Sequence, residues 1–135
     1  CHRPEYATVL RWWNEGVAER MRLVDRYLAG AEGAVSGRSD SDPARLATAQ
    51  ARRLLDLVTD AGGQHNLPLS HRFFEDALAS ASEAYRLAGR GTPPVPALGR
   101  PPRQGLCAYC HYRIAEPGLT ERMDDAFHRE VVGTR

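Results

Sequence analysis

Two closely spaced cysteines near the C-terminus carry the clearest chemical signal in this sequence. Cys107 and Cys110 are separated by two residues, and the turn of such a pair lets two thiolates meet one metal ion. His111 follows directly, so the same stretch also has the CxxCH pattern by which c-type haem is attached. A thioredoxin-like redox role would require a strand before the pair and a helix after it, and no such strand is readable. The pattern therefore favours a metal or cofactor site over a thioredoxin-like redox site.

The residues that follow extend this pattern. Ile114 lies four positions beyond Cys110, and Phe127 and His128 come after a polar stretch. The arrangement resembles the first zinc half of LIM-type and related treble-clef modules, and it covers about the last quarter of the chain. The resemblance implies that Cys107, Cys110 and His128 are zinc ligands, with Ile114 and Phe127 packed beneath the metal.

The fourth zinc ligand does not follow from the resemblance. The family places it three residues after the histidine, where this chain has Val131, which cannot bind zinc. Structural zinc sites are four-coordinate, so another group must complete the site. An open fourth position would instead suit a small metal-dependent hydrolase, although two thiolates leave zinc a weak Lewis acid. The candidates for the fourth ligand are Cys1, His111, Asp124, Glu130 and a residue of a second copy.

A haem site is the alternative for the same residues. Cys107 and Cys110 would form the thioethers and His111 would be the proximal ligand. Met123 or His128 would be the distal ligand. The position of the motif is similar to that in the cytochrome c′ family and implies electron transfer, but there the motif lies on a long helix, whereas proline-rich chain precedes it here. Zinc is favoured over haem, and a cofactor-free pair of thiols or a local disulfide is the remaining alternative.

The elements that must position this segment are predicted to be helices. The first begins at Pro4 and ends at Gly30 and Gly33, and residues 31–41 form an exposed loop. Trp12 beside Trp13 places one indole off the apolar stripe, which suggests a contact with a partner or a second copy. The stripe expected to be buried comprises Tyr6, Leu10, Trp13, Val17, Met21, Val24 and Leu28.

A second helix is predicted from the N-cap Asp42 to Gly62. Its expected buried face comprises Leu46, Leu54, Leu57, Val58 and Ala61. A third helix is predicted to be capped by Ser70, with a hydrophobic staple between Leu69 and Phe74, and to end at Gly89. Its stripe comprises Phe74, Ala77, Leu78, Ala81, Tyr85 and Ala88, while His65 and His71 are expected to be surface or capping residues.

These elements predict a mainly α protein with three parts. Residues 1–89 form a three-helix antiparallel bundle, residues 90–106 a proline- and glycine-rich linker draped over it, and residues 107–135 a small zinc-knuckle-like module. A zinc module of this kind, joined to a bundle, implies a non-enzymatic binding protein that acts as an adaptor or regulator.

Composition restricts the partners of such a module. The chain has 135 residues, 42% of them hydrophobic, and its 18 basic residues (all Arg) against 17 acidic ones leave a net charge of +1. That balance provides no strong field for nucleic acid or a membrane surface, so a protein partner is favoured over nucleic acid. No run of apolar residues is long enough to span a membrane. Three cysteines, two of them spaced for a metal, favour a reducing cytoplasm over a secreted disulfide scaffold.

Overall fold

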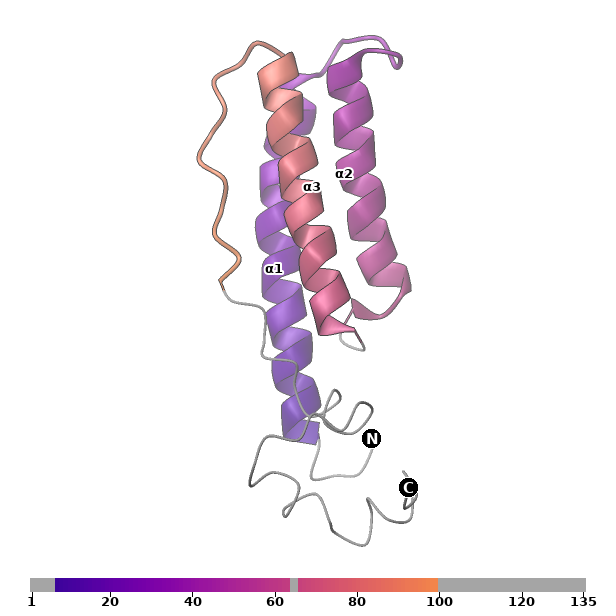
Figure 1. Cartoon of the computed structure of the whole chain (residues 1–135), viewed down its shortest axis with the longest axis vertical. Coiled ribbons are helices and arrows are strands. Elements are labelled where there is room, and N and C mark those ends of the chain that lie inside the picture. The colour runs from indigo at the N-terminus through magenta and orange to yellow at the C-terminus, as the bar shows by residue number, and fades with distance from the viewer. Residues whose placement is uncertain (1–6, 64–65, 100–135) are drawn as a thin grey trace, which may run out of the picture. The chain divides into compact units, whose positions relative to one another are not determined.

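The computed structural model describes residues 7–63 and 66–99, and the side chains of residues 7–10 and 12 are not among what is described. Three helices occupy this part of the chain: α1 (Ala7–Ala34), α2 (Pro43–Asp60) and α3 (Leu67–Leu87). They run up, down and up in an antiparallel bundle (Figure 1). The described residues contain no strand, so the mainly α prediction is confirmed for them.

Helix α1 extends further at its C-terminal end than the sequence predicts, while its predicted start at Pro4 lies outside the described residues. It passes through Gly30 and Gly33 and ends at Ala34, because the apolar stripe continues beyond the glycines to the buried Ala31 and Val35. Gly30 does not end the helix. A Cβ at this position would collide with the hydroxyl of Tyr85, so glycine leaves room on α1 for the Tyr85 side chain of α3.

The ends of helix α2 agree with the prediction, but its buried face does not. The Asp42 carboxylate accepts a hydrogen bond from the backbone N–H of Ala44 at 2.8 Å, and the helix ends before Gly62, whose φ is +59°. Of the predicted buried residues, Val58 is buried and Leu54 is half-buried, whereas Leu46, Leu57 and Ala61 are exposed. The residues that are buried are Ala44, Thr48, Ala51, Leu55 and Val58.

Small side chains explain this choice of face. The alanines of α2 belong to one core cluster with three alanines of α3, and all five are fully buried. Short side chains let two helix axes approach closely, whereas leucines at the contact would hold them apart. The alanines concerned are Ala44 and Ala51 of α2 and Ala77, Ala81 and Ala84 of α3.

Helix α3 begins earlier than predicted and ends where predicted. Its N-cap is Asn66, whose side chain accepts a hydrogen bond from the N–H of Leu69 at 3.2 Å. Ser70 is buried inside the helix and donates its hydroxyl proton to the carbonyl of Gly63 at 2.7 Å, so it is not the cap. At the other end, Gly89 has φ +68° and the chain makes the paired hydrogen bonds of a Schellman motif. The remainder of the predicted stripe is confirmed except for Ala88, which is half-buried.

The core lies between the three helices. Val24 and Leu28 of α1, as predicted, are fully buried, while Val17 and Met21 are half-buried against the core. Trp13 is half-buried, and Tyr6 and Leu10 lie outside the residues whose side chains are described. The rings of Tyr27 and Tyr85 meet edge to face, with centroids 5.5 Å apart. The fully buried side chains of greatest volume are Phe74, Leu28, Val24 and Val58.

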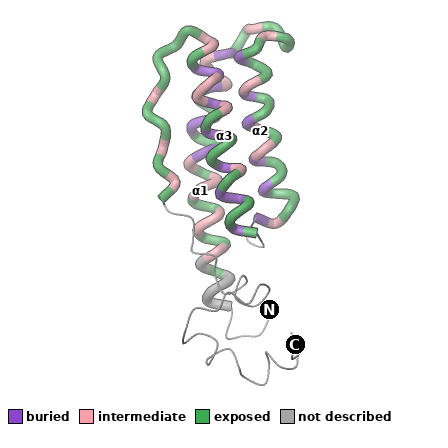
Figure 2. Tube along the Cα trace, in the orientation of Figure 1, coloured by how far each residue is buried: buried purple, intermediate pink, exposed green. Residues whose placement is uncertain are grey.

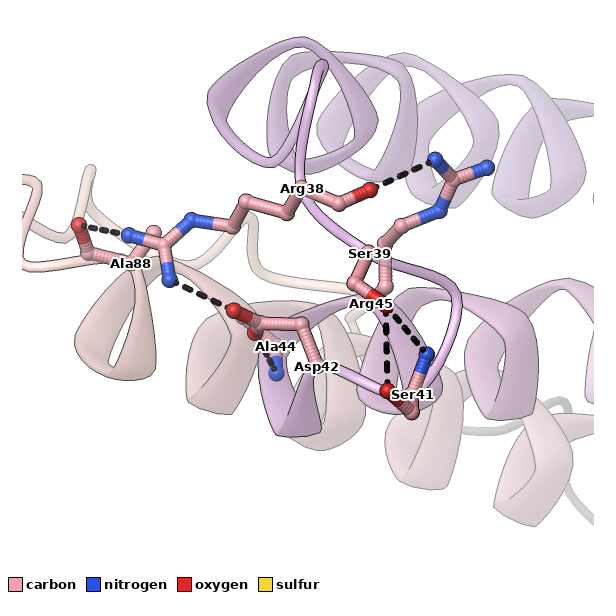
Figure 3. Close-up of polar contacts among 7 residues, drawn as sticks. All are labelled: Arg38, Ser39, Ser41, Asp42, Ala44, Arg45 and Ala88. Carbon is pink, nitrogen blue, oxygen red and sulfur yellow. Dashed lines mark hydrogen bonds and ion pairs between the residues drawn. The ribbon is translucent and has the colours of Figure 1, made fainter.

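Polar contacts fix the loop between α1 and α2 to the end of α3 (Figure 3). The Arg38 guanidinium donates to the Asp42 carboxylate and to the carbonyl of Ala88, both at 3.0 Å. Arg45 in turn donates to the carbonyl of Arg38 at 3.0 Å. A cation at the last carbonyls of a helix is favourable, so Arg38 caps α3 while it supports the N-cap of α2.

After α3 the chain returns along the bundle in an extended segment, residues 91–99, here called the strap (Figure 1). The Tyr27 hydroxyl donates to the carbonyl of Pro93 at 3.1 Å, and Leu98 packs against the core. For these residues the expectation of extended chain draped over the bundle is confirmed. The rest of the predicted linker, residues 100–106, lies outside the described residues.

Candidate functional site

The residues predicted from the sequence to bind metal all lie outside the described part of the chain. These are Cys107, Cys110 and His128, with the further candidates Cys1, His111, Asp124 and Glu130. Within residues 7–63 and 66–99, no group of three histidine, cysteine or acidic side chains is placed to hold a metal ion. The zinc site therefore stays a prediction, as does its haem alternative.

His71 was expected at the surface or at a helix end, and that expectation is wrong. It is buried in α3, where its Nε2 lies 3.4 Å from the Glu75 carboxylate. Its Nδ1 is buried without a hydrogen-bond partner among the described residues. Ser82, on the same side of α3, follows His71 by eleven residues, which is roughly 16 Å along a helix. This distance excludes a nucleophile–base pair between the two side chains.

The described part of the bundle has a larger and a smaller hollow that could be considered as binding sites. The larger, about 530 Å³, lies between α3 and the strap, and the smaller, about 190 Å³, between α1 and the end of α2. Glu75 and Glu83 border the larger hollow. Hydrogen bonds from Arg86 hold the pKa of the Glu83 carboxyl below its ordinary value, so Glu83 is engaged as an ion pair. Neither hollow brings together the groups of an acid–base or nucleophilic site.

The most distinctive surface feature is an apolar stripe on α2 and α3, here called the leucine face. Large apolar side chains in both helices remain in contact with solvent: Leu46 is 52% exposed, Leu57 49% and Leu69 42%. Figure 2 shows exposed positions alternating with buried and half-buried ones along both helices. Three half-buried residues lie between these leucines and the core. The leucine face comprises Leu46, Leu54 and Leu57 of α2 and Leu69, Phe73 and Leu87 of α3.

Helical periodicity places these six residues on one side of the α2–α3 pair. Leu46 and Leu57 are eleven residues apart, about three turns, and Leu69 and Leu87 are eighteen apart, about five turns. Each pair therefore shares a face of its helix, and Leu54 and Phe73 stand one turn from Leu57 and Leu69. Because α2 and α3 are antiparallel neighbours, the two stripes run beside each other (Figure 1).

That side points away from α1. Arg52 of α2 forms ion pairs with Asp25 and Glu32 of α1, and the position of Leu57 is rotated about 140° from it around the helix. Tyr85 of α3 contacts α1, and the position of Leu87 is rotated about 160° from it. The leucine face is therefore the side of the α2–α3 hairpin that α1 leaves uncovered.

The other two sides of the bundle carry contacts that the leucine face lacks. Hydrogen bonds between Arg52 and the carboxylates of Asp25 and Glu32 cross from α2 to α1, and they raise the pKa of the Arg52 guanidinium above its ordinary value. The strap follows α1 and α3, to which it is joined through Tyr27 and Leu98. Among the described residues, nothing comparable covers the leucine face.

Sequence reasoning assigned Leu46 and Leu57 to the core and so missed this surface. A signal was present in the pattern, because α2 carries two apolar arcs, one rich in leucine and one in alanine. Only one arc can face the core of a three-helix bundle.

Comparison with family models, curated proteins and solved structures gives no match for this chain. None of the three described helices combines the length and hydrophobicity that a membrane crossing demands.

Proposed function

We propose that this chain is a non-enzymatic, zinc-stabilised binding module that contacts another protein through its leucine face. The observation that carries the binding role is the solvent exposure of Leu46, Leu57 and Leu69 along one side of an otherwise well-packed bundle. Exposed apolar residues that share one side of a bundle are typical of protein contact surfaces in soluble domains. Exposed polar residues lie between these leucines, namely Gln50 and Arg53 on α2 and Asp76 on α3, so the surface is mixed in character.

Zinc is the second part of the proposal. The donor set of Cys107, Cys110 and His128 suits Zn²⁺, because soft thiolates and imidazole are its preferred ligands. Bound zinc would hold this segment in a compact zinc-knuckle-like module after the linker. Thiolates that bind zinc must stay reduced, so the proposal places the protein in the cytoplasm.

A metal analysis with an absorption spectrum tests the zinc site. Protein purified without chelators should contain one colourless equivalent of zinc, which the Cys107→Ser variant loses. The variants Cys1→Ser, His111→Asn and Glu130→Gln identify the fourth ligand, since only its loss should weaken zinc retention strongly. A Soret band in the absorption spectrum would show that the site binds haem instead of zinc. Protein that contains neither metal nor haem would refute both the zinc site and the haem site.

Photo-crosslinking in the source cells tests the leucine face. A benzophenone side chain at position 57 should form protein adducts, whereas the same group at position 95 should not. Val95 is a matched control because it is 50% exposed but lies on the strap. Equal adduct yields at the two positions, or none at position 57, would contradict the proposal. Adducts with nucleic acid at position 57 would favour the nucleic-acid-binding alternative, whose affinity must fall steeply with salt.

A further inference from the structure

We propose that the partner of the leucine face is a second copy of this chain, so that the α2–α3 hairpins of two protomers pack face to face. This inference rests on the proposed function, because it names the occupant of the same surface. Three features support it: the symmetry of the stripe, the charges at its edges and its area.

A two-fold axis parallel to the helices gives the simplest packing. It places α2 of one protomer over α3 of the other, with all neighbouring helices antiparallel, as in a four-helix bundle. A two-fold interface must be self-complementary, and this one is, because α2 and α3 both present leucines along the same side. Leu57 then faces Leu69 and Phe73 of the second copy.

The charged edges of the leucine face also complement each other. Arg53 is an exposed residue of α2, seven positions after Leu46, and Asp76 is an exposed residue of α3, seven positions after Leu69. Each charge is therefore rotated only about 20° from a leucine of its helix, toward the outer edge of the leucine face. Within the described part of the chain, neither has an ion-pair partner. The two-fold axis brings the outer edge of α2 against the outer edge of α3 in the other copy.

The heights of these two charges along the bundle match. A Cβ on Gly63 would lie 2.6 Å from Val58 and 3.1 Å from Ser70, so Val58 and Ser70 are level. Arg53 precedes Val58 by five residues and Asp76 follows Ser70 by six, so both are about 8–9 Å further along the bundle. A two-fold axis parallel to the helices leaves height unchanged. It therefore sets Arg53 opposite Asp76 of the second copy, and does so twice.

The area is sufficient for a dimer of modest affinity. Helix α2 has 18 residues. At about 1.5 Å per residue and about 10 Å per helix, the hairpin face measures roughly 27 by 20 Å. Two such faces bury about 1,100 Å², close to the roughly 1,000 Å² that a specific interface needs. We expect half-dissociation at about micromolar concentration.

Analytical ultracentrifugation of the full chain, reduced and with zinc, tests the dimer over a concentration series. The mass should rise from that of a monomer to that of a dimer. Leu57→Glu should weaken the association at least about 100-fold, because symmetry places the buried charge in the interface twice. Val95→Glu, at an equally exposed residue of the strap, should leave the association unchanged.

A charge exchange provides a second test, which keeps every leucine of the face in place. Arg53→Asp and Asp76→Arg should each weaken the dimer by about 2- to 30-fold, since two edge pairs are lost in each case. The double variant should recover most of the affinity. Circular dichroism must show the same helix content in every variant. We expect this result because positions 53 and 76 are exposed, so their side chains can change without altering the core.

The results separate this inference from the proposed function. A chain that stays monomeric at about 1 mM, or a dimer indifferent to both Leu57→Glu and the charge exchange, overturns the second copy as partner. Crosslinks from position 57 to a different protein would then leave the proposed function standing. A monomer without crosslinks at position 57 overturns both.

Discussion

Two glycines in helix α1 should respond in opposite directions to the same substitution. Gly30 and Gly33 both lie inside α1, where alanine is intrinsically favoured over glycine by about 0.5–1 kcal/mol. Helix propensity alone predicts that alanine stabilises the protein at either position. A Cβ on Gly33 would meet nothing within 4 Å, whereas one on Gly30 would collide with the Tyr85 hydroxyl.

The expected magnitudes follow from this difference. Gly33→Ala should raise the free energy of unfolding by about 0.5–1 kcal/mol. Gly30→Ala should lower it by about 1–2 kcal/mol, because an overpacking cost of about 1–3 kcal/mol exceeds the gain in propensity. Tyr85 has little room to move, since it is buried and its ring packs against Tyr27. At about 4–8 °C per kcal/mol, the melting temperatures of the two variants should differ by roughly 6–24 °C.

Urea unfolding followed by circular dichroism measures both values, and a double-mutant cycle identifies the cause. Tyr85→Phe removes the atom that the new Cβ would strike, so Gly30→Ala should cost much less in that background. Stabilisation by Gly30→Ala equal to that by Gly33→Ala would refute the close approach. So would a cost for Gly30→Ala that is the same with Phe as with Tyr at position 85.

Three further predictions concern polar contacts that position the helices. Arg52→Gln should lower the free energy of unfolding by about 0.5–1 kcal/mol, and high salt should reduce this effect. The control Arg26→Gln, at an exposed arginine of α1, should change the free energy of unfolding by less than about 0.5 kcal/mol. Equal losses in the two variants would count against the α1–α2 ion pairs. The N–H of Ala44 and the guanidinium of Arg38 lower the pKa of the Asp42 carboxyl. A lowered folded-state pKa gives stability that is present above the unfolded pKa of about 3.9 and is lost as pH falls through the folded-state pKa. The difference in free energy of unfolding between wild type and Asp42→Ala should therefore shrink in that acid range and stay constant above about pH 6. Tyr27→Phe removes the hydrogen bond to the carbonyl of Pro93. This variant should be cleaved faster by proteases within the strap, while its helix content stays unchanged. An unaltered cleavage rate would show that this bond does not hold the strap.

Most of the secondary structure was predictable because its signals are local. Asp42 followed by proline, and Gly89 after an apolar stripe, are chemical devices that act within one helical turn, and the structure uses both. The start of α3 was assigned to Ser70, although Asn66 is a cap of the same kind. Ser70 is instead satisfied by a carbonyl of the preceding turn, a contact that the linear sequence does not display.

The sequence by itself determined three amphipathic helices and an extended proline-rich segment, and it predicts the zinc donors Cys107, Cys110 and His128. Those results depend on residue type and on short spacings along the chain. Tertiary structure alone decided that α1 continues through Gly30, and that the alanine arc of α2 rather than the leucine arc is buried. The physical reason is packing: which face a helix buries depends on the side chains opposite it, and the face of α2 that carries Ala44 and Ala51 belongs to one core cluster with the alanines of α3. The leucines left outside form the surface to which we assign the binding of a second copy.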